Sequence, residues 1–277
     1  MITSTFRHLP GVGAAFEERL WRAGCLSWQD AAARDDIPCR RYEAGTFASG
    51  LADSHERLAA GDAAWFSQRL GAADQWRLFA TFRHQAAYVD IETTGLGWPE
   101  SHITTIALWD GFQLRTYRHG DNLEAFADDI RDYKLLVTFN GRGFDAPFIE
   151  QTFRLKLDMA HLDLRWVLKP LGYAGGLKRV EQAFGLDRGG LAGVDGYTAV
   201  LLWRHWQNSG DDRALETLLA YNAEDVLTLE PLAVHAYNAH LTGLPALPEH
   251  PLPQCGRADN PFNASAEVLR KVGVRAA

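Results

Sequence analysis

The sequence predicts an α/β fold in which helices flank a mixed β-sheet, preceded by a small all-helical region. Residues 1–82 are rich in Ala and Arg with few β-branched runs, which is typical of short helices. Beyond them, strand-like and helix-like segments alternate, and a hydrophobic content of 47% over 277 residues can form a substantial core. We therefore expect a helical domain at 1–82, an α/β domain at 83–242 and a Pro-rich C-terminal tail at 243–277.

Strands are predicted at the start of the α/β region. AAYVDIETTGL at 86–96 is compact and apolar enough for one strand, and residues 103–120 predict two more around Asp110-Gly111. An Asp-Gly pair between alternating apolar runs favours a type I′ turn, because that turn needs positive φ at both central residues. We therefore expect a hairpin there.

Helices and a further strand follow. NLEAFADDIRDY at 122–133 predicts a helix that Asp121 or Asn122 caps, and LLVTF at 135–139 predicts a buried strand. Helical patterns continue at 145–156, 176–186, 197–207 and 212–229. Pro231 should end or kink the last of these helices, and the Pro-rich text after Gly243 predicts a tail that is extended along the surface or disordered.

Composition excludes several classes of protein. The net charge of −7 disfavours a protein that coats nucleic acid by bulk electrostatics, yet allows an enzyme whose site is an acidic cluster. No stretch approaches the roughly 18–20 apolar residues of a membrane span, and the N-terminus lacks the features of a secretory signal. The widely spaced Cys25, Cys39 and Cys255 predict free thiols in a reducing compartment. We therefore expect a cytoplasmic protein without a membrane partner.

Two acidic residues interrupt the first predicted strand. Asp90 and Glu92 are two residues apart and leave one face of the strand, whereas Val89 and Ile91 leave the other. Like charges in a low-dielectric setting repel one another and lose hydration, and a hard divalent cation would compensate both effects. The alternative is a strand with a solvated polar face. The turn at 93–96 would place backbone amides and hydroxyls beside these carboxylates.

Two later segments carry further acidic residues. A Gly-x-Gly loop after the buried strand leads to Asp145 in the first turn of a helix, where it either joins the first two carboxylates or only complements the helix dipole. Tyr221 and Asp225 are four residues apart and share a helix face, a spacing that is common in helices without catalytic roles. Glu224 lies about 100° from Asp225 around that helix and is expected to be solvated or capping.

Read in order, these segments resemble the three motifs of DEDD-type 3′→5′ exonucleases, which have an RNase H-like fold: D-I-E-T-T-G at 90–95, F-N-x-x-x-F-D at 139–145 and Y-N-x-x-D at 221–225. A tyrosine four residues before the last aspartate is typical of the DEDDy branch, found in DNA polymerase proofreading domains. The DEDDh branch would have histidine at position 220, which is alanine here. The likeness covers residues 85–241. Within this clan the chain resembles the YprB-like group, through motifs at 161–164, 176–178 and 185–188.

The resemblance implies two-metal phosphodiester hydrolysis. The implied ligands of two Mg²⁺ or Mn²⁺ ions are Asp90, Glu92, Asp145 and Asp225, with Asp90 between the ions. Oxygen ligands select hard cations, and the sequence contains no His or Cys cluster that would indicate zinc. Tyr221 would orient the attacking water, because an ordinary tyrosine pKa of about 10 makes it a poor base near neutral pH.

The resemblance also implies where the substrate lies. Its implied contacts are Thr93, Thr94, Gly95 and Leu96 at the terminal nucleotide, with Leu96 wedged against a base, and Asn140 and Phe144 at the second nucleotide. Arg142 and Lys178 are candidates for phosphate contacts, with a solvated surface cation as the alternative for each. Trp98 and Trp109 are candidates for base stacking, with burial in a strand as the alternative for Trp109.

The N-terminal region contains a glycine-rich turn. L-P-G-V-G at 9–13 precedes a predicted helix and then A-G-C-L-S at 23–27, a pattern that is similar to a helix-hairpin-helix element. In that element a Gly-x-Gly hairpin presents backbone amides to phosphates without reading the base sequence. Gly11 and Gly13 are therefore candidates for nucleic-acid contacts. The alternative is a turn within a small packing domain.

Together these features predict a divalent-metal-dependent 3′→5′ exonuclease. Single-stranded DNA or a frayed 3′ end is the favoured substrate, because a site built around a terminal hydroxyl does not accept an intact duplex. Two alternatives stay open. The same site could act on RNA, since the sequence contains nothing that tests for a 2′-OH. The chain could also be a non-catalytic nucleic-acid adaptor, which the presence of all four carboxylates disfavours.

Overall fold

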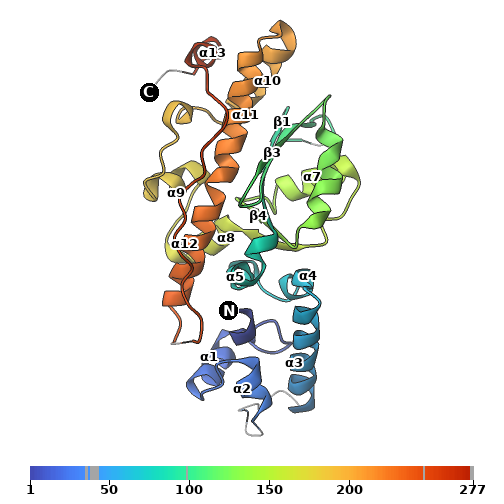
Figure 1. The fold of residues 1–277 in the computed structure, drawn as a ribbon, viewed down its shortest axis with the longest axis vertical. Helices are drawn as coiled ribbons and strands as arrows, with labels where there is room; N and C mark the ends of the chain where they lie inside the picture. Colours follow the sequence, from blue (N-terminus) through green and yellow to red (C-terminus); the bar gives the residue numbers. More distant parts are fainter. Residues whose placement is uncertain (35–36, 38–43, 98, 246, 275–277) are drawn as a thin grey trace.

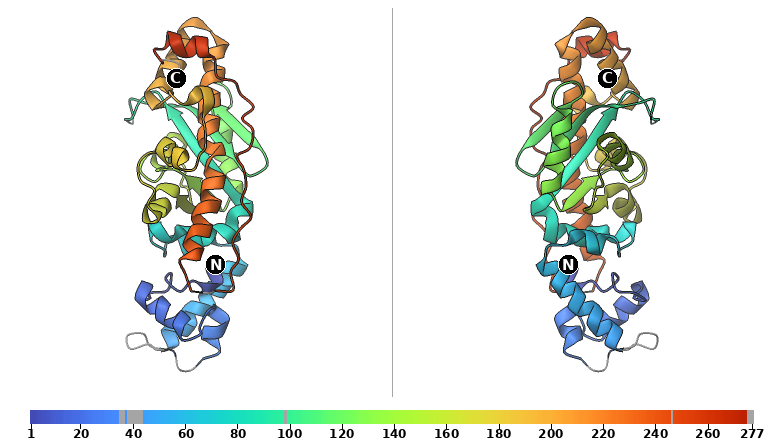
Figure 2. Two further views of the ribbon diagram at one scale, coloured as in Figure 1. Left: turned by 90° about the vertical axis from the view of Figure 1, so that its left-hand side faces the viewer. Right: turned by 90° about the vertical axis from the view of Figure 1, so that its right-hand side faces the viewer.

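The structure is a computed structural model that describes residues 1–34, 37, 44–97, 99–245 and 247–274. The molecule is elongated, with the N-terminal helices at one end and the sheet with its covering helices in the middle (Figures 1 and 2). Cys39 and Trp98 lie outside the described residues. Within those ranges, no helix combines the length and the apolar character needed to cross a membrane.

The N-terminal region is helical, as the sequence predicts, but one of its helices has 16 residues and is longer than the short helices expected. They are α1 (Ala14–Arg22), α2 (Trp28–Ala32), α3 (Ala44–Ala59), α4 (Ala63–Ser67) and α5 (Phe79–Phe82), with the 3-10 helices η1 (Ile2–Ser4), η2 (Ala72–Leu78) and η3 (Arg83–Gln85). Helix α2 begins with a capping box in which Ser27 and Asp30 each accept a hydrogen bond from the other's backbone N–H. Helix α1 begins after Gly13, which has extended backbone and no capping side chain.

A five-stranded mixed sheet forms the centre of the molecule. Its strands are β1 (Ala86–Thr93), β2 (Ile103–Trp109), β3 (Leu114–Arg118), β4 (Leu135–Thr138) and β5 (Ala160–Asp163). The spatial order is β3-β2-β1-β4-β5, with the first three strands antiparallel and with β4 and β5 parallel to β1. Strand β1 therefore lies at the middle of the sheet, where Asp90 pairs with Ala107 of β2.

Helices cover both faces of this sheet (Figure 1). On one face, Val89 and Ile91 pack with residues of α6 (Phe126–Asp129) and α7 (Asp145–Phe153). On the other face, α11 (Asp212–Leu227) packs against β1 and β2. The alternation of β1 thus directs Asp90 and Glu92 toward α11, because the neighbouring apolar side chains face the opposite way.

The hairpin between β2 and β3 has a different turn from the one predicted. Residues 110–113 connect the strands, and the Asp110 carboxylate accepts hydrogen bonds from the backbone N–H groups of Phe112 (2.9 Å) and Gln113 (2.8 Å). Only Gly111 has positive φ, +93°, so the type I′ prediction is wrong. The Asp110 side chain stabilises a wider loop, and this removes the need for positive φ at both central residues.

The predicted helix at 122–133 is divided into three short pieces. They are the 3-10 helix η4 (Leu123–Ala125), α6, and the 3-10 helix η5 (Ile130–Asp132). Asn122 does not cap them, so the capping prediction is wrong. Its side chain instead accepts from Arg118 N (2.8 Å) and donates to Thr116 O (3.0 Å), which fastens this segment to β3.

The remaining helices follow the predicted order. They are α8 (Leu164–Leu168), α9 (Leu177–Ala183), α10 (Gly196–Ser209), α11 and α12 (Leu229–Thr242), with the 3-10 helices η6 (Lys169–Leu171) and η7 (Gly189–Leu191). The long pattern ends at Leu227 and a new helix begins at Leu229, so Pro231 falls in the first turn of α12. Proline is tolerated in a first turn because its missing N–H has no intrahelical acceptor there.

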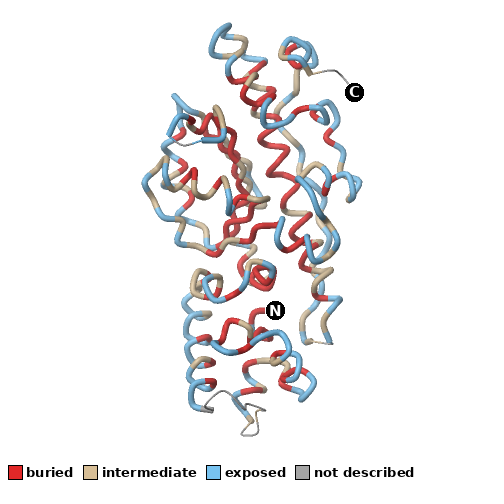
Figure 3. The backbone as a smooth tube through the Cα atoms, turned by 180° about the vertical axis from the view of Figure 1, so that it is seen from behind, coloured by how far each residue is buried: buried red, intermediate tan, exposed pale blue. Residues whose placement is uncertain are grey.

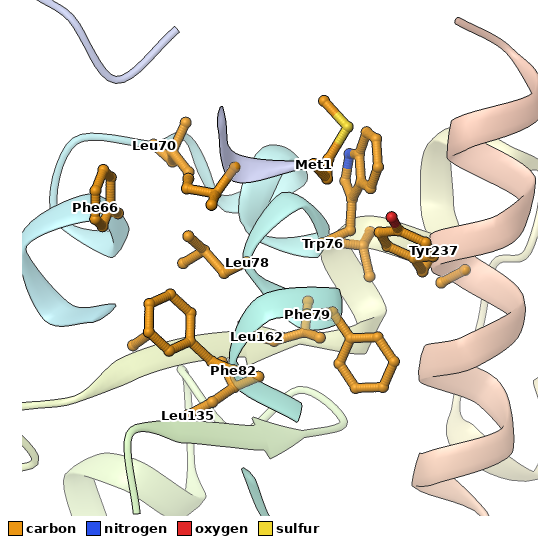
Figure 4. Packing of buried hydrophobic residues seen from close by; sticks show 14 of the residues in the cluster. Met1, Phe66, Leu70, Trp76, Leu78, Phe79, Phe82, Leu135, Leu162 and Tyr237 are labelled. Carbon is orange, nitrogen blue, oxygen red and sulfur yellow. The ribbon is translucent and has the colours of Figure 1, made fainter. Parts of the chain in front are cut away.

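The N-terminal helices share a hydrophobic cluster with the sheet and α12. Figure 4 shows Phe82 beside Leu135 of β4, and the same cluster includes Phe66 and Leu78 and continues to Tyr237 of α12. The predicted division at residue 82 falls between α5 and β1, and this cluster runs across it. Buried residues run through the sheet and along α11, and others lie in the N-terminal helices (Figure 3). The helical region is thus packed directly onto the end of the sheet where β1 begins.

The C-terminal segment runs along α12 and α11 in an extended path before α13 (Ala266–Lys271) (Figure 2). Asn238 of α12 exchanges two hydrogen bonds with the backbone of Leu252, at 2.7 and 2.8 Å. Farther along, Thr217 of α11 accepts from the backbone N–H of Ser265 at 2.9 Å. These contacts give part of the Pro-rich segment backbone partners on α12 and α11.

Candidate active site

Strand β1 and helix α11 bring three carboxylates together. One oxygen each from Asp90, Glu92 and Asp225 lies within 4.8 Å of the other two. Glu92 and Asp225 are buried, with exposed fractions of 8% and 6%, and Asp90 is partly buried. The predicted convergence of these three residues is therefore present, although Asp225 follows Asp90 and Glu92 by more than 130 positions in the chain.

A fourth acidic residue, Asp145, is the first residue of helix α7. Its Oδ1 accepts a hydrogen bond from the backbone N–H of Ile91 at 3.1 Å, so it is fixed to β1 between Asp90 and Glu92. Asp145 does not belong to the group of oxygens within 4.8 Å. The hydrogen bond to Ile91 places it beside the group, and its charge contributes to raising the pKa of both Asp90 and Glu92.

The pKa values of these carboxyl groups follow from burial and mutual repulsion. Burial is the largest cause that raises the pKa of Asp90 and of Glu92, followed by the charges of Asp225 and Asp145. Burial raises the pKa of Asp145 to about 7. The pKa of Asp225 is also raised by burial, and the adjacent guanidinium of Arg188 opposes that rise. The protein thus holds together several acidic groups whose ionised forms destabilise one another.

The donor set fits a hard divalent cation. All three clustered groups are carboxylates, with no His or Cys among them, and oxygen-only ligands favour Mg²⁺ or Mn²⁺ over zinc. Asn222 of α11, which is fully buried, donates to Asp90 O (3.1 Å) and to Asp90 Oδ2 (2.8 Å). Among the described residues nothing hydrogen-bonds to Asn222 Oδ1, which is itself buried. A bound cation would neutralise the cluster that these residues hold in place.

Asn222 is a site residue that the sequence reasoning did not select. It is part of the Y-N-x-x-D motif and lies three residues before Asp225, on the same side of the helix. The spacing of three residues between Asn222 and Asp225 would have been enough to predict that Asn222 faces the site. Because its amide holds both the backbone and the side chain of Asp90, it joins α11 to β1 at the cluster.

Tyr221 lies on the cluster side of α11, as predicted from its spacing to Asp225. Its side chain is 6% exposed, and its ring lies 5.8 Å from the guanidinium carbon of Arg188 and 5.5 Å from Lys178 Nζ. Burial, followed by the charges of Asp225 and Glu92, raises the pKa of Tyr221. The phenol therefore stays protonated at neutral pH and can donate a hydrogen bond.

Glu224 is buried, which corrects the expectation that it is solvated or capping. It is 3% exposed and forms an ion pair with Arg257 of the C-terminal segment. Asn260 of the same segment donates to Ala220 O at 2.8 Å and to Glu224 Oε2 at 3.4 Å. The expectation was wrong because the extended C-terminal segment packs on this side of α11, which the helical spacing alone does not indicate.

The turn after β1 is held by its own side chains. Thr93 Oγ1 donates to Gly95 O at 2.6 Å, and Thr94 Oγ1 accepts from the backbone N–H of His102 at 3.1 Å. Leu96 is 88% exposed, so its apolar side chain has no packing role in the core. The turn therefore presents an exposed apolar side chain next to the strand that carries Asp90 and Glu92.

The loop after β4 is organised by Asp163, whose carboxylate accepts from Asn140 N (2.8 Å) and Arg142 N (3.1 Å). Asn140 has φ of 66°, and the Arg142 guanidinium donates to His161 O at 2.6 Å. Phe144 precedes α7 and is partly buried. Each of these predicted substrate residues thus lies on the loop that leads into Asp145.

Gly11 and Gly13 lie in the N-terminal helical region, just before α1. Both are exposed, Gly11 has φ of +76°, and the N-terminal helices occupy the opposite end of the molecule from α10 and α13 (Figure 1). Trp109 is partly buried, and its Nε1 donates to Glu230 at 2.8 Å. This hydrogen bond and the partial burial agree with the alternative that Trp109 packs within a strand and does not stack on a base.

Comparisons with known proteins identify the family of the α/β region. Residues 87–237 match the family described as the RNase_H superfamily. Among solved structures, the family B DNA polymerase from the hyperthermophilic archaeon Pyrobaculum calidifontis is similar at 17% sequence identity and a TM-score of 0.40, over 55% of this chain and 25% of the polymerase chain. No curated protein matches the chain.

Proposed function

This chain belongs to the RNase H superfamily, and we propose that it is a divalent-metal-dependent 3′→5′ exonuclease of the DEDDy type, similar to the YprB-like group, that acts on single-stranded DNA. Its mixed five-stranded sheet with flanking helices is the RNase H-like fold that the sequence predicts. A superfamily that consists mostly of nucleases supports nuclease activity and nucleic-acid binding. The 3′→5′ direction, the DNA substrate and the metal number are our proposal.

The observation that carries the proposal is the convergence of acidic groups at one point of the sheet. Asp90 and Glu92 come from β1, Asp225 comes from α11, and Asp145 is tied to β1 through the N–H of Ile91. Burying several carboxylates together costs free energy, and proteins accept that cost mainly at functional sites. A cation site is the function that their oxygen chemistry supports.

We propose that Asp90, Glu92 and Asp225 hold the more central of two Mg²⁺ or Mn²⁺ ions and that Asp145 contributes to a second. When bound, such cations promote formation of the hydrolytic nucleophile and stabilise negative charge on the leaving 3′ oxygen. Asn222 keeps Asp90 oriented from the side of α11. Tyr221, which its raised pKa keeps protonated, donates a hydrogen bond that positions the attacking water.

Substrate binding is proposed on both sides of the cluster. The exposed Leu96 would contact the terminal base, with Thr93, Thr94 and Gly95 lining the adjacent turn. Asn140 and Phe144 would face the second nucleotide, and Arg142 and Lys178 would approach phosphates. The backbone amides at Gly11 and Gly13 would bind a more distant part of the strand, in keeping with their exposure at the far end of the molecule.

A degradation assay with end-labelled oligonucleotides tests this function. With Mg²⁺ or Mn²⁺, a 3′ label should be released at once as a mononucleotide, while a 5′-labelled strand should shorten stepwise. EDTA and Asp90→Asn should abolish both. Asp128→Asn, which removes a carboxylate from a side chain that is 83% exposed, should cleave like the unmodified chain.

Parallel DNA and RNA substrates separate the alternatives. Faster degradation of the ribo-oligomer would replace the DNA assignment by an exoribonuclease. Binding without cleavage, with or without cations, would instead support a nucleic-acid adaptor. Release of internal fragments from both labels would contradict the proposed direction.

A further inference from the structure

A buried arginine contacts one of the clustered carboxylates from outside the sequence motifs that carry the acidic groups. Arg188 follows α9 and is 8% exposed. Its Nη2 forms an ion pair with Asp225 Oδ1 and also donates to Glu181 Oε1 at 2.8 Å, while its Nε donates to Glu181 Oε2. One guanidinium therefore binds two carboxylates at once.

Glu181 is itself held in place. It is 1% exposed on α9, and the hydroxyl of Thr228 donates to its Oε1 at 2.7 Å. Thr228 directly follows α11, three residues after Asp225, and its hydroxyl also contacts Asp225 O at 3.3 Å. The contacts close a ring, from Asp225 through Arg188 and Glu181 to Thr228 and back to the backbone of Asp225.

We propose that Arg188 is a positioning residue for the cation site: anchored by Glu181, it binds Oδ1 of Asp225 and so leaves Oδ2 as the oxygen that Asp225 offers to a cation. The inference rests on the proposed function, because it assigns Asp225 to a bound cation. A carboxylate with one oxygen committed to an arginine has one oxygen left to offer. The site is then preorganised before the cation arrives.

The geometry of an arginine is necessary for this role. The planar guanidinium offers a fixed fork of donors that can span Glu181 and Asp225 together, whereas the lysine ammonium is a compact point charge on a flexible stem. A lysine at position 188 would keep the positive charge near the cluster and lose the double contact. Charge and orientation can therefore be separated by one substitution.

The test is Mn²⁺ binding to the full chain, measured by isothermal titration calorimetry without nucleic acid. Arg188→Lys should weaken Mn²⁺ binding by about 10- to 100-fold, the range typical for partners that orient metal ligands. Binding that is unchanged or tighter would overturn the inference, since it would mean that Arg188 is only structural or competes with the cation for Asp225.

The matched control is Arg77→Lys. Arg77 is 3% exposed and forms a two-point ion pair with the buried Glu17, at 2.9 and 3.1 Å, in the N-terminal helical region. Both substitutions should lower the unfolding temperature, because both remove a buried forked pair. Only Arg188→Lys should change the Mn²⁺ affinity, and an equal change in Arg77→Lys would overturn the inference.

Thr228→Val keeps the test decisive if Arg188→Lys does not fold. It removes the hydroxyl that holds Glu181 and should weaken Mn²⁺ binding about fivefold, the effect of losing one ordinary hydrogen bond. An unchanged affinity would count against the ring of contacts. If the unmodified chain and Asp225→Asn both fail to bind Mn²⁺, the proposed function fails as well, whereas normal binding by the unmodified chain and by Arg188→Lys removes only this inference.

Discussion

Replacing Glu92 by glutamine should stabilise the protein in the absence of cations. Glu92 is 8% exposed, and its carboxylate lies within 4.8 Å of carboxylate oxygens of Asp90 and Asp225. At that 4.8 Å separation and an effective dielectric constant of about 20, one ionised pair repels by about 3.5 kcal/mol. Glutamine has nearly the same shape and no charge, so the substitution removes this repulsion.

Keeping Glu92 protonated instead costs about as much free energy as the repulsion between the ionised groups. Holding it protonated at pH 7 against an ordinary pKa of 4.5 costs about 3.4 kcal/mol, at about 1.36 kcal/mol for each pH unit. The folded chain must therefore accept either the repulsion or the proton uptake, and glutamine avoids both. We expect a gain of about 3 kcal/mol, which for 277 residues corresponds to a rise of about 5 °C in Tm.

Thermal unfolding in EDTA measures the stability of the cation-free protein, and unfolding in Mn²⁺ measures the stabilisation by the cation. In EDTA the Glu92→Gln chain should unfold at the higher temperature, and Mn²⁺ should stabilise it less than the unmodified chain. Glu17→Gln is the matched control, because Glu17 is also buried but is paired with Arg77. Breaking that pair should destabilise the protein by about 3–5 kcal/mol. A lower Tm for Glu92→Gln in EDTA would refute the reasoning.

Three other outcomes are expected. Tyr221→Phe should lower turnover severalfold and leave the Mn²⁺ affinity unchanged, because the phenol positions water and is not a ligand; equal turnover in single-turnover assays would remove this role. Gly141→Ala should destabilise the protein by about 1–3 kcal/mol in urea unfolding, because the new Cβ would lie 2.5 Å from Thr138 Oγ1, whereas Gly143→Ala meets nothing closer than 3.9 Å and should be nearly neutral. Burial lowers the pKa of His8 from 6.5 to about 3 in the folded protein. As the pH falls below 6.5, His8 is therefore protonated in the unfolded chain but not in the folded one, and stability is lost. His8→Gln should reduce that loss by about 1.4 kcal/mol per pH unit between pH 6 and pH 4, and identical pH slopes would contradict the argument.

Local periodicity accounts for the parts of the site that the sequence predicts. Side chains two apart on a strand share a face, which placed Asp90 with Glu92, and side chains four apart on a helix share a face, which placed Tyr221 with Asp225. Pro231 likewise marks the boundary between α11 and α12, since a missing N–H acts on its own helix. These features need only the residues within one element.

Long-range contacts decided the rest. Glu224 is buried because the C-terminal segment covers it, and Asp225 meets Arg188 because the segment after α9 packs against α11. Asp110 forms a wider loop through its own carboxylate, although Asp-Gly favours a tighter turn. The amino-acid sequence alone determined which groups share a face of an element. Only the tertiary structure decided which partner each of those faces meets, because that depends on the packing of segments that are distant in the chain.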